Sequence, residues 1–152
     1  MENVLQNILD QLPYRKPFLF VDNLISVGPE GAEGYYTFPP DSWFYQGHFP
    51  QYPVTPGVLL TECCAQIGVV CLGIYLAAQS AVTAAPGAPA FALSDSDMDF
   101  LRPVLPGERV RVVSRKEYFR FGKLRCRVQL FNEANELACK GQISGMIQKG
   151  NP

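Results

Sequence analysis

Histidine and paired cysteines are almost missing from this chain of 152 residues. His48 is the only histidine, and no two of the five cysteines stand in a C-x-x-C arrangement. A zinc site would therefore lack most of its usual ligands, and we expect no metal. We interpret the cysteines as reduced side chains of a cytoplasmic protein, since cytoplasmic thiols are kept reduced.

Basic residues are absent between Lys16 and Arg102. This absence bears on residues 58–78, which are long and apolar enough to span a bilayer. No lysine or arginine would anchor either end of such a span, and Glu62 and Gln66 would be costly in lipid. We therefore interpret the segment as a helix buried inside a domain and expect no membrane contact. The acidic N-terminus also lacks the basic region of a secretory signal.

Charge is divided unevenly along the chain, although the formal net charge is only −1. Residues 1–101 hold two basic and ten acidic residues, whereas residues 102–152 hold eleven basic and four acidic ones. The basic half would attract an acidic partner, or it would supply only the solvated faces of strands. A pI of 5.8 and the absence of a recognition motif argue against a nucleic-acid partner.

One carboxylate and one imidazole stand apart from the other charges. Glu62 is the only charged residue between Asp41 and Asp95, and His48 lies fourteen positions before it. An imidazole titrates near neutral pH, and apolar surroundings raise the pKa of a carboxyl group toward a useful working range. His48 and Glu62 are therefore the candidate acid/base pair.

The spacing of apolar residues predicts a single α+β domain over residues 1–152. We expect a short helix over 3–12, strands over 18–27 and 34–38, and an ordered loop over 39–57. A long helix begins near Thr55, which serves as its N-cap, and runs to about Gln79. Residues 80–89 are expected to be a linking loop. The alternating pattern after Arg109 predicts half-buried antiparallel strands.

Five ordered blocks resemble one known family. They are residues 12–22 (LPYRKPFLFVD), 47–50 (GHFP), 53–59 (PVTPGVL), 62–66 (ECCAQ) and 100–107 (FLRPVLPG). Together they resemble the β-hydroxyacyl-[acyl carrier protein] dehydratases of FabZ type, which have the hot-dog fold. The resemblance covers about residues 12–110, and the strand pattern that follows also fits.

The resemblance implies a fold, a reaction and partners. An antiparallel sheet would wrap around a long central helix, and two subunits would join edge to edge and share active sites. His48 would come from one subunit and Glu62 from the other. The family eliminates water from a β-hydroxyacyl thioester to give the trans-enoyl product. The acyl chain is held on the phosphopantetheine of acyl carrier protein and no other cofactor is implied. A trimer of dimers would be a further assembly.

The chemistry of the residues agrees with these roles. His48 is the candidate base for the α-proton, and Glu62 would protonate or position the departing hydroxyl. The backbone N–H groups of Gly57 and Val58 lie in the first turn of the long helix, where free donors favour a developing oxyanion. Gln66, one turn after Glu62, would orient the carboxylate.

Each site residue also has a plainly structural interpretation. His48 would be a loop histidine bonded to backbone, and Glu62 a carboxylate satisfied by the helix N-terminus. Gln66 would make a structural hydrogen bond, and Gly57 would only allow close packing. Three alternating carboxylates, Asp95, Asp97 and Asp99, are interpreted as solvated groups on an edge strand and not as a metal cage.

Three departures from the family pattern concern the substrate more than the chemistry. Tyr14 stands where the family commonly has histidine, and Gln51 where it often has glycine. The linker 80–89 is longer and richer in alanine than expected. Related isomerising dehydratases carry aspartate at the position of Glu62, so isomerisation is not expected here.

Two other functions use the same fold. A hot-dog thioesterase would hydrolyse the thioester, but the blocks containing His48 and Glu62 argue against it. A non-catalytic acyl-binding subunit would keep an apolar tunnel for the acyl chain and lose turnover. The presence of His48 and Glu62 speaks against this function.

Overall fold

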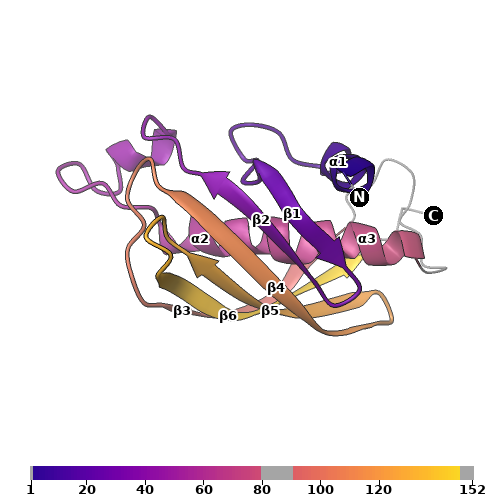
Figure 1. Ribbon diagram of the computed structural model, residues 1–152. Coiled ribbons are helices and arrows are strands. Elements are labelled where there is room, and N and C mark those ends of the chain that lie inside the picture. Colours follow the sequence, from indigo (N-terminus) through magenta and orange to yellow (C-terminus); the bar gives the residue numbers. More distant parts are fainter. Residues whose placement is uncertain (1, 80–90, 148–152) are drawn as a thin grey trace, which may run out of the picture.

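A long helix lies along the inner face of a curved antiparallel sheet (Figure 1). The computed structural model describes residues 2–79 and 91–147. Before the sheet comes the short helix α1 (Glu2–Asp10). The strands are β1 (Asn23–Gly28), β2 (Gly31–Thr37), β3 (Phe91–Phe100), β4 (Arg109–Arg120), β5 (Lys123–Phe131) and β6 (Leu137–Ile147). The predicted α+β architecture, a sheet wrapped around a central helix, is confirmed.

The sheet order is β1-β2-β4-β5-β6-β3, and every neighbouring pair is antiparallel. β3 enters the sheet at one end, because it follows the long helix in the chain and pairs with β6. Within the described residues β6 is its only partner strand, so the carboxylates of β3 lie on an edge strand, as predicted. One rim of the sheet is therefore left with unpaired backbone groups.

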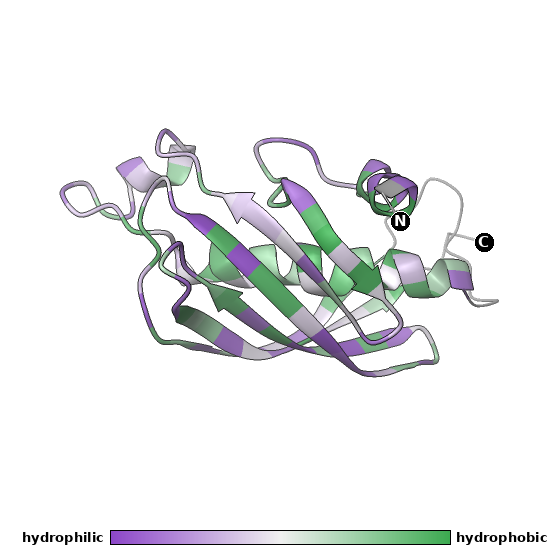
Figure 2. Ribbon diagram, viewed as in Figure 1, coloured by the Kyte–Doolittle hydropathy of each residue, from purple (hydrophilic) through white to green (hydrophobic). Residues whose placement is uncertain are grey.

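Alternation along the strands separates an inner from an outer face. Leu124, Cys126, Val128 and Leu130 of β5 are buried against the helix, whereas Arg127 and Gln129 are exposed on the other side. Successive side chains of a strand point to opposite faces, so this period of two buries one face. Figure 2 shows the resulting alternation of apolar and polar residues along the strands.

The central helix is continuous from Gly57 to Gln79. It consists of α2 (Gly57–Cys64), the π-helical segment η2 (Ala65–Val70) and α3 (Cys71–Gln79). It is apolar and long enough to cross a membrane by composition, but most of its apolar stretch is buried inside the protein. A helix that is hydrophobic all round is the expected core of a sheet that encloses it.

One sequence prediction needs correction, and another concerns residues that the structure does not describe. The strand predicted over 18–27 begins only at Asn23, because the backbone around Phe18 and Phe20 bonds to the side chain of Gln66 instead of to a strand. The linker predicted over 80–89 lies outside the described residues.

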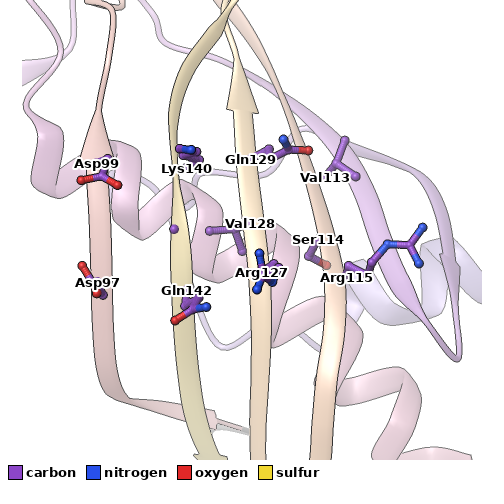
Figure 3. Close-up of a pocket in the computed structure, with 11 residues that line it drawn as sticks. Asp97, Asp99, Val113, Ser114, Arg115, Arg127, Val128, Gln129, Lys140 and Gln142 are labelled. Atoms are coloured by element: carbon purple, nitrogen blue, oxygen red, sulfur yellow. The ribbon is translucent and has the colours of Figure 1, made fainter.

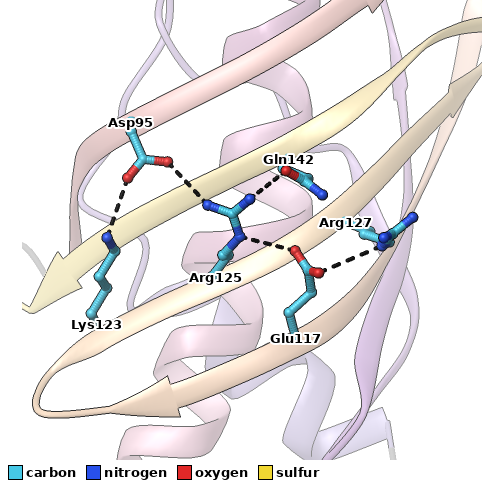
Figure 4. Close-up of polar contacts among 6 residues, drawn as sticks. All are labelled: Asp95, Glu117, Lys123, Arg125, Arg127 and Gln142. Atoms are coloured by element: carbon cyan, nitrogen blue, oxygen red, sulfur yellow. Dashed lines mark hydrogen bonds and ion pairs between the residues drawn. The ribbon is translucent and has the colours of Figure 1, made fainter.

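An ion-pair network crosses the outer face of the sheet (Figure 4). Asp95 pairs with Lys123 at 3.3 Å and with Arg125 at 3.8 Å, and Glu117 bridges Arg125 and Arg127. Carboxylates from β3 and β4 therefore offset part of the basic charge of β5. Three of the eleven basic residues of the C-terminal half thus lie in ion pairs on a solvated strand face, in keeping with one of the two interpretations.

The helix approaches the sheet closely at Gly68. A Cβ at this position would lie 2.9 Å from the Cβ of Ser114 and 3.1 Å from Cγ1 of Val128. Ser114 and Val128 belong to the inner faces of β4 and β5, so their positions are set by the sheet backbone. The absence of a side chain at Gly68 therefore sets the distance between helix and sheet.

We expect Gly68→Ala to lower the free energy of unfolding by about 1 kcal/mol. Overpacking costs about 1–3 kcal/mol, and better helix propensity returns at most about 1 kcal/mol. Chemical denaturation measures the difference. Gly28→Ala is the matched control, because a Cβ there meets nothing within 4 Å. Equal stability of the two variants would contradict a tight helix–sheet contact.

Candidate active site

His48 is held by the loop that precedes the central helix. Its backbone N–H donates to the carbonyl of Phe44 in the short 3-10 turn η1 (Trp43–Gln46), and its carbonyl accepts from Val54. The ring of Phe49 stacks on the imidazole with centroids 4.2 Å apart. These contacts fix the position of the ring although much of the surrounding loop is exposed.

The hydrogen bond of the imidazole determines which nitrogen is free. Nδ1 of His48 lies 2.8 Å from the carbonyl oxygen of Val54. A carbonyl oxygen only accepts, so Nδ1 carries the proton in this contact. In the neutral ring this leaves the lone pair on Nε2, the nitrogen that could then act as a general base.

The start of the central helix differs from the prediction in its cap. Pro56 occupies the N-cap position and makes no side-chain capping bond. The side chain of Thr55, predicted as the N-cap, pairs instead with the hydroxyl of Tyr45 at 2.6 Å, and its N–H donates to Val104. Thr55 therefore anchors the loop to neighbouring segments instead of capping the helix.

Free donors lie at this helix start. Within the described residues no backbone hydrogen bond occupies the N–H of Gly57 or of Val58. These are the unpaired donors that every helix N-terminus leaves, and the helix dipole adds positive potential there. Gly57 also packs closely, because a Cβ would lie 3.1 Å from the ring of Phe100. Both interpretations of Gly57, packing and backbone access, are thus compatible.

Glu62 and Gln66 meet as their spacing predicts. Nε2 of Gln66 donates to Oε2 of Glu62 at 2.9 Å and to the carbonyl of Phe18 at 3.1 Å. Oε1 of Gln66 accepts from the N–H of Phe20 at 2.8 Å. Gln66 is fully buried, so its orientation is fixed by three partners. The carboxylate of Glu62 is thereby oriented by a rigid donor.

Burial raises the pKa of Glu62, and the hydrogen bond from Gln66 opposes that rise in part. Desolvation penalises the ionised carboxylate, so the proton is retained to higher pH than in water. Burial, and next the charge of Glu62, raise the pKa of Tyr14, whose hydroxyl therefore stays protonated beside the carboxylate. Burial therefore shifts the pKa values of both Glu62 and Tyr14 upward.

An apolar cavity of about 260 Å³ opens beside Glu62. The central helix, the N-terminal segment and the ends of β3 and β6 line it. Its lining residues are Tyr14, Phe18, Glu62, Ala65, Val69, Val70, Phe91, Ala92, Leu93 and Gly145. One ionisable carboxyl in an apolar cavity is typical of a site that acts on an apolar ligand.

His48 and Glu62 are not joined within one chain. No hydrogen bond or ion pair links the two side chains in the described ranges 2–79 and 91–147. Each is oriented separately, His48 by Val54 and Glu62 by Gln66. Their combination in one site therefore remains a prediction.

A wider hollow of about 500 Å³ lies elsewhere, on the outer face of the sheet (Figure 3). Charged side chains from four strands line it, among them Asp97, Arg115, Arg127 and Lys140. The candidate acid/base residues do not line it. It is therefore a feature of the solvated sheet face.

Sequence reasoning missed part of this site. The backbone of Phe18 and Phe20 was assigned to a strand, yet it holds Gln66. Tyr14 was noted only as a departure from the family pattern, although it lies against Glu62. The replacement of histidine at position 14 was the only available signal. The contacts themselves join residues far apart in the chain.

Comparison with known proteins decides the family. The FabA-like domain family matches residues 12–130. The chain belongs to this FabA-like family. It is 30% identical over 149 residues to the "3-hydroxyacyl-[acyl-carrier-protein] dehydratase FabZ" of Deinococcus radiodurans, covering 97% of this chain and 95% of that protein. The FabZ of Rhodospirillum rubrum is 38% identical over 114 residues, or 74% of this chain and 68% of that protein. The resemblance stated from the sequence blocks is confirmed.

Solved structures with the same fold are more distant in sequence. The dehydratase heterocomplex ApeI:P from Xenorhabdus doucetiae superimposes on this FabA-like chain with a TM-score of 0.71. The superposition covers 93% of this chain and 91% of the Xenorhabdus chain, at 11% sequence identity. A Streptococcus mutans protein bound to acetyl CoA gives a TM-score of 0.64 at 13% identity, with coverages of 93% and 98%. At these identities the likeness concerns the fold alone.

We expect Glu62→Gln to make the protein more resistant to urea at pH 7. A carboxyl whose pKa is raised by folding lowers stability at pH values above its unfolded-state pKa, because the unfolded chain releases the proton more readily, so the penalty is present at neutral pH. It fades as the pH falls through the raised pKa toward the ordinary value of 4.5. The advantage of the variant should therefore shrink on acidification. Urea midpoints across this pH range measure it.

Glu133→Gln serves as the control for this experiment, because Glu133 is exposed. It should follow the wild-type pH profile. A Glu62→Gln protein that is less stable than wild type at pH 7 would show that the ionised carboxylate stabilises the fold.

Proposed function

We propose that this protein is a hydro-lyase that eliminates water from β-hydroxyacyl thioesters carried on acyl carrier protein, in fatty-acid or related acyl-chain biosynthesis. The observation that carries the proposal is the carboxyl group of Glu62, which Gln66 orients beside an apolar cavity and whose pKa is raised by burial. Membership of the FabA-like family and the FabZ relatives support it.

The proposed elimination uses two side chains and one helix start. Nε2 of His48 takes the proton from the carbon next to the thioester carbonyl. The electron pair forms the new double bond as the C–O bond of the β-hydroxyl breaks. Glu62 gives its proton to the departing hydroxyl, which leaves as water. The N–H groups of Gly57 and Val58 stabilise the charge that develops on the thioester oxygen.

A protonated Glu62 is what this step needs. An ionised carboxylate cannot donate to the leaving hydroxyl, and an unperturbed glutamic acid is almost fully ionised at neutral pH. Burial of Glu62 shifts that balance toward the acid. The single hydrogen bond from Gln66 orients the group without neutralising the effect. This is the pattern of two titratable groups whose surroundings give them opposite roles.

We propose a homodimer in which each site takes His48 from one subunit and Glu62 from the other. Apolar side chains are exposed along β3 and at the helix start, including Val58, Leu93, Phe100 and Leu101. The same rim of the sheet carries the unpaired edge of β3. A second copy related by a two-fold axis would cover both features.

The proposed substrate needs no cofactor beyond the phosphopantetheine of the carrier protein. The reaction moves protons and breaks one C–O bond, without redox chemistry. Arg102 lines an open hollow together with Gly57, donates to the carbonyl of Leu137 and pairs with Glu136 at 3.7 Å. We assign the enzyme to the cytoplasm, in keeping with five free, buried cysteines.

We expect His48→Ala and Glu62→Ala each to abolish formation of enoyl product from a β-hydroxyacyl carrier-protein thioester. Co-expression of the two variants should restore about a quarter of wild-type activity. In a shared-site dimer, half of the dimers are mixed, and each mixed dimer has one intact site. Ultraviolet absorbance of the enoyl thioester follows the reaction, and free thiol is measured in parallel.

The results of these assays distinguish the dehydratase from the two alternative functions. Thiol release without enoyl product would indicate a thioesterase, and tight binding without turnover would indicate an acyl-binding subunit. Inactive single variants that gain nothing when combined would place both residues in the same subunit. Co-expression of two His48→Ala copies with different tags controls for the effect of co-expression itself.

A further inference from the structure

One aromatic ring in the wall of the cavity beside Glu62 is almost fully buried. Phe91, the first residue of β3, lines the cavity together with Val70 and is only 4% exposed. Phe119 of β4 packs against it with ring centroids 6.4 Å apart. Glu62 and Phe91 therefore line the same apolar space.

The ring reaches this position because the helix has no side chain at Gly73. A Cβ at Gly73 would lie 2.0 Å from Cε2 of Phe91 and 2.4 Å from its Cζ. No side chain tolerates such a contact, so glycine is required for the ring to rest on the helix backbone. Gly73 thus makes room for the ring of Phe91. It lies one helical turn beyond Val70, the last helical residue that lines the cavity, and therefore on the side away from Glu62.

The length of the cavity follows from the helix that forms its floor. Helical lining residues run from Glu62 to Val70, which spans about 12 Å at about 1.5 Å per residue. An extended alkyl chain with C–C bonds of about 1.5 Å advances about 1.3 Å per carbon, so roughly nine carbons fit. The walls are apolar along this length, with Ala65, Val69 and Leu93 among them.

We propose that Phe91, seated on Gly73, sets the upper length of the acyl chain, so that the enzyme acts on short and medium chains. The inference rests on the proposed dehydratase function, and it concerns the specificity of that site. A longer tail would have to displace a buried ring that is held between the helix backbone and Phe119. Acyl chains that end before Phe91 gain apolar contact without displacing the ring.

The test is a chain-length profile. Dehydration rates are measured on β-hydroxyacyl carrier-protein thioesters of about 4 to about 16 carbons. Wild type should lose kcat/KM beyond the medium chains. Phe91→Ala should raise kcat/KM for the longest chains relative to the short ones by at least about tenfold, because each added methylene then finds apolar contact. Phe121→Ala, a phenylalanine that is 96% exposed, is the matched control and should leave the profile unchanged.

Two further variants decide the matter if Phe91→Ala does not fold. Phe91→Leu keeps an apolar residue and removes the far part of the ring, so it should lengthen the profile by a smaller amount. Gly145→Ala acts in the opposite direction, because its methyl would stand in the cavity wall 3.2 Å from Val69 and 3.5 Å from Phe91. It should reduce turnover of the longest accepted chains several-fold and spare the short ones.

Each outcome has a distinct meaning. Absence of dehydration in the wild type on every chain length would overturn the proposed function. Dehydration with a profile that neither Phe91→Leu nor Gly145→Ala changes would overturn the chain-length inference and leave the function standing. Opposite shifts of the profile in these two variants would support the inference.

Discussion

The carboxamide of Gln66 joins three parts of the molecule in one hydrogen-bonded unit. It binds the carbonyl of Phe18 and the N–H of Phe20 from the N-terminal segment, and it donates to Glu62 on its own helix. A fully buried amide that lost one of these partners would pay a desolvation penalty of about 1–3 kcal/mol. The same contacts therefore fix the path of the N-terminal segment and the direction of the carboxylate, and a change at Gln66 would disturb both.

Gln66 has this position because the sheet surrounds the helix. A sheet that encloses its helix leaves no exposed helix face for polar residues, so any polar group on it must be satisfied inside the protein. Gln66 meets that demand through the backbone of residues 18–20, which explains why this segment forms no strand. Glu62, one turn earlier, lies at the border of the enclosed region, beside the cavity.

Local patterns were sufficient for most of the fold and for part of the site. The central helix, the strands β4 to β6 and the contact between Glu62 and Gln66 follow from periodicities of 3.6 and 2, which short-range sequence carries. The N-cap assigned to Thr55 and the start of the strand assigned to 18–27 were wrong, because Tyr45 and Gln66 supply side-chain partners that local propensity does not include. The seat of Phe91 on Gly73 is likewise a contact between separate elements, and a lone glycine in an apolar helix does not indicate which ring will fill the space.

The scarcity of basic residues along the middle of the chain has a consequence for the chemistry. Within the described residues Glu62 has no ion-pair partner, and its only side-chain hydrogen bond comes from a neutral amide. A lysine or arginine on the same helix would favour the ionised carboxylate and oppose the proposed role of Glu62 as a proton donor. Basic charge is instead placed on the outer face of the sheet, where Asp95 and Glu117 offset part of it. Burying an unpaired carboxyl costs stability at neutral pH, and the same burial raises the pKa of Glu62 beside an apolar cavity.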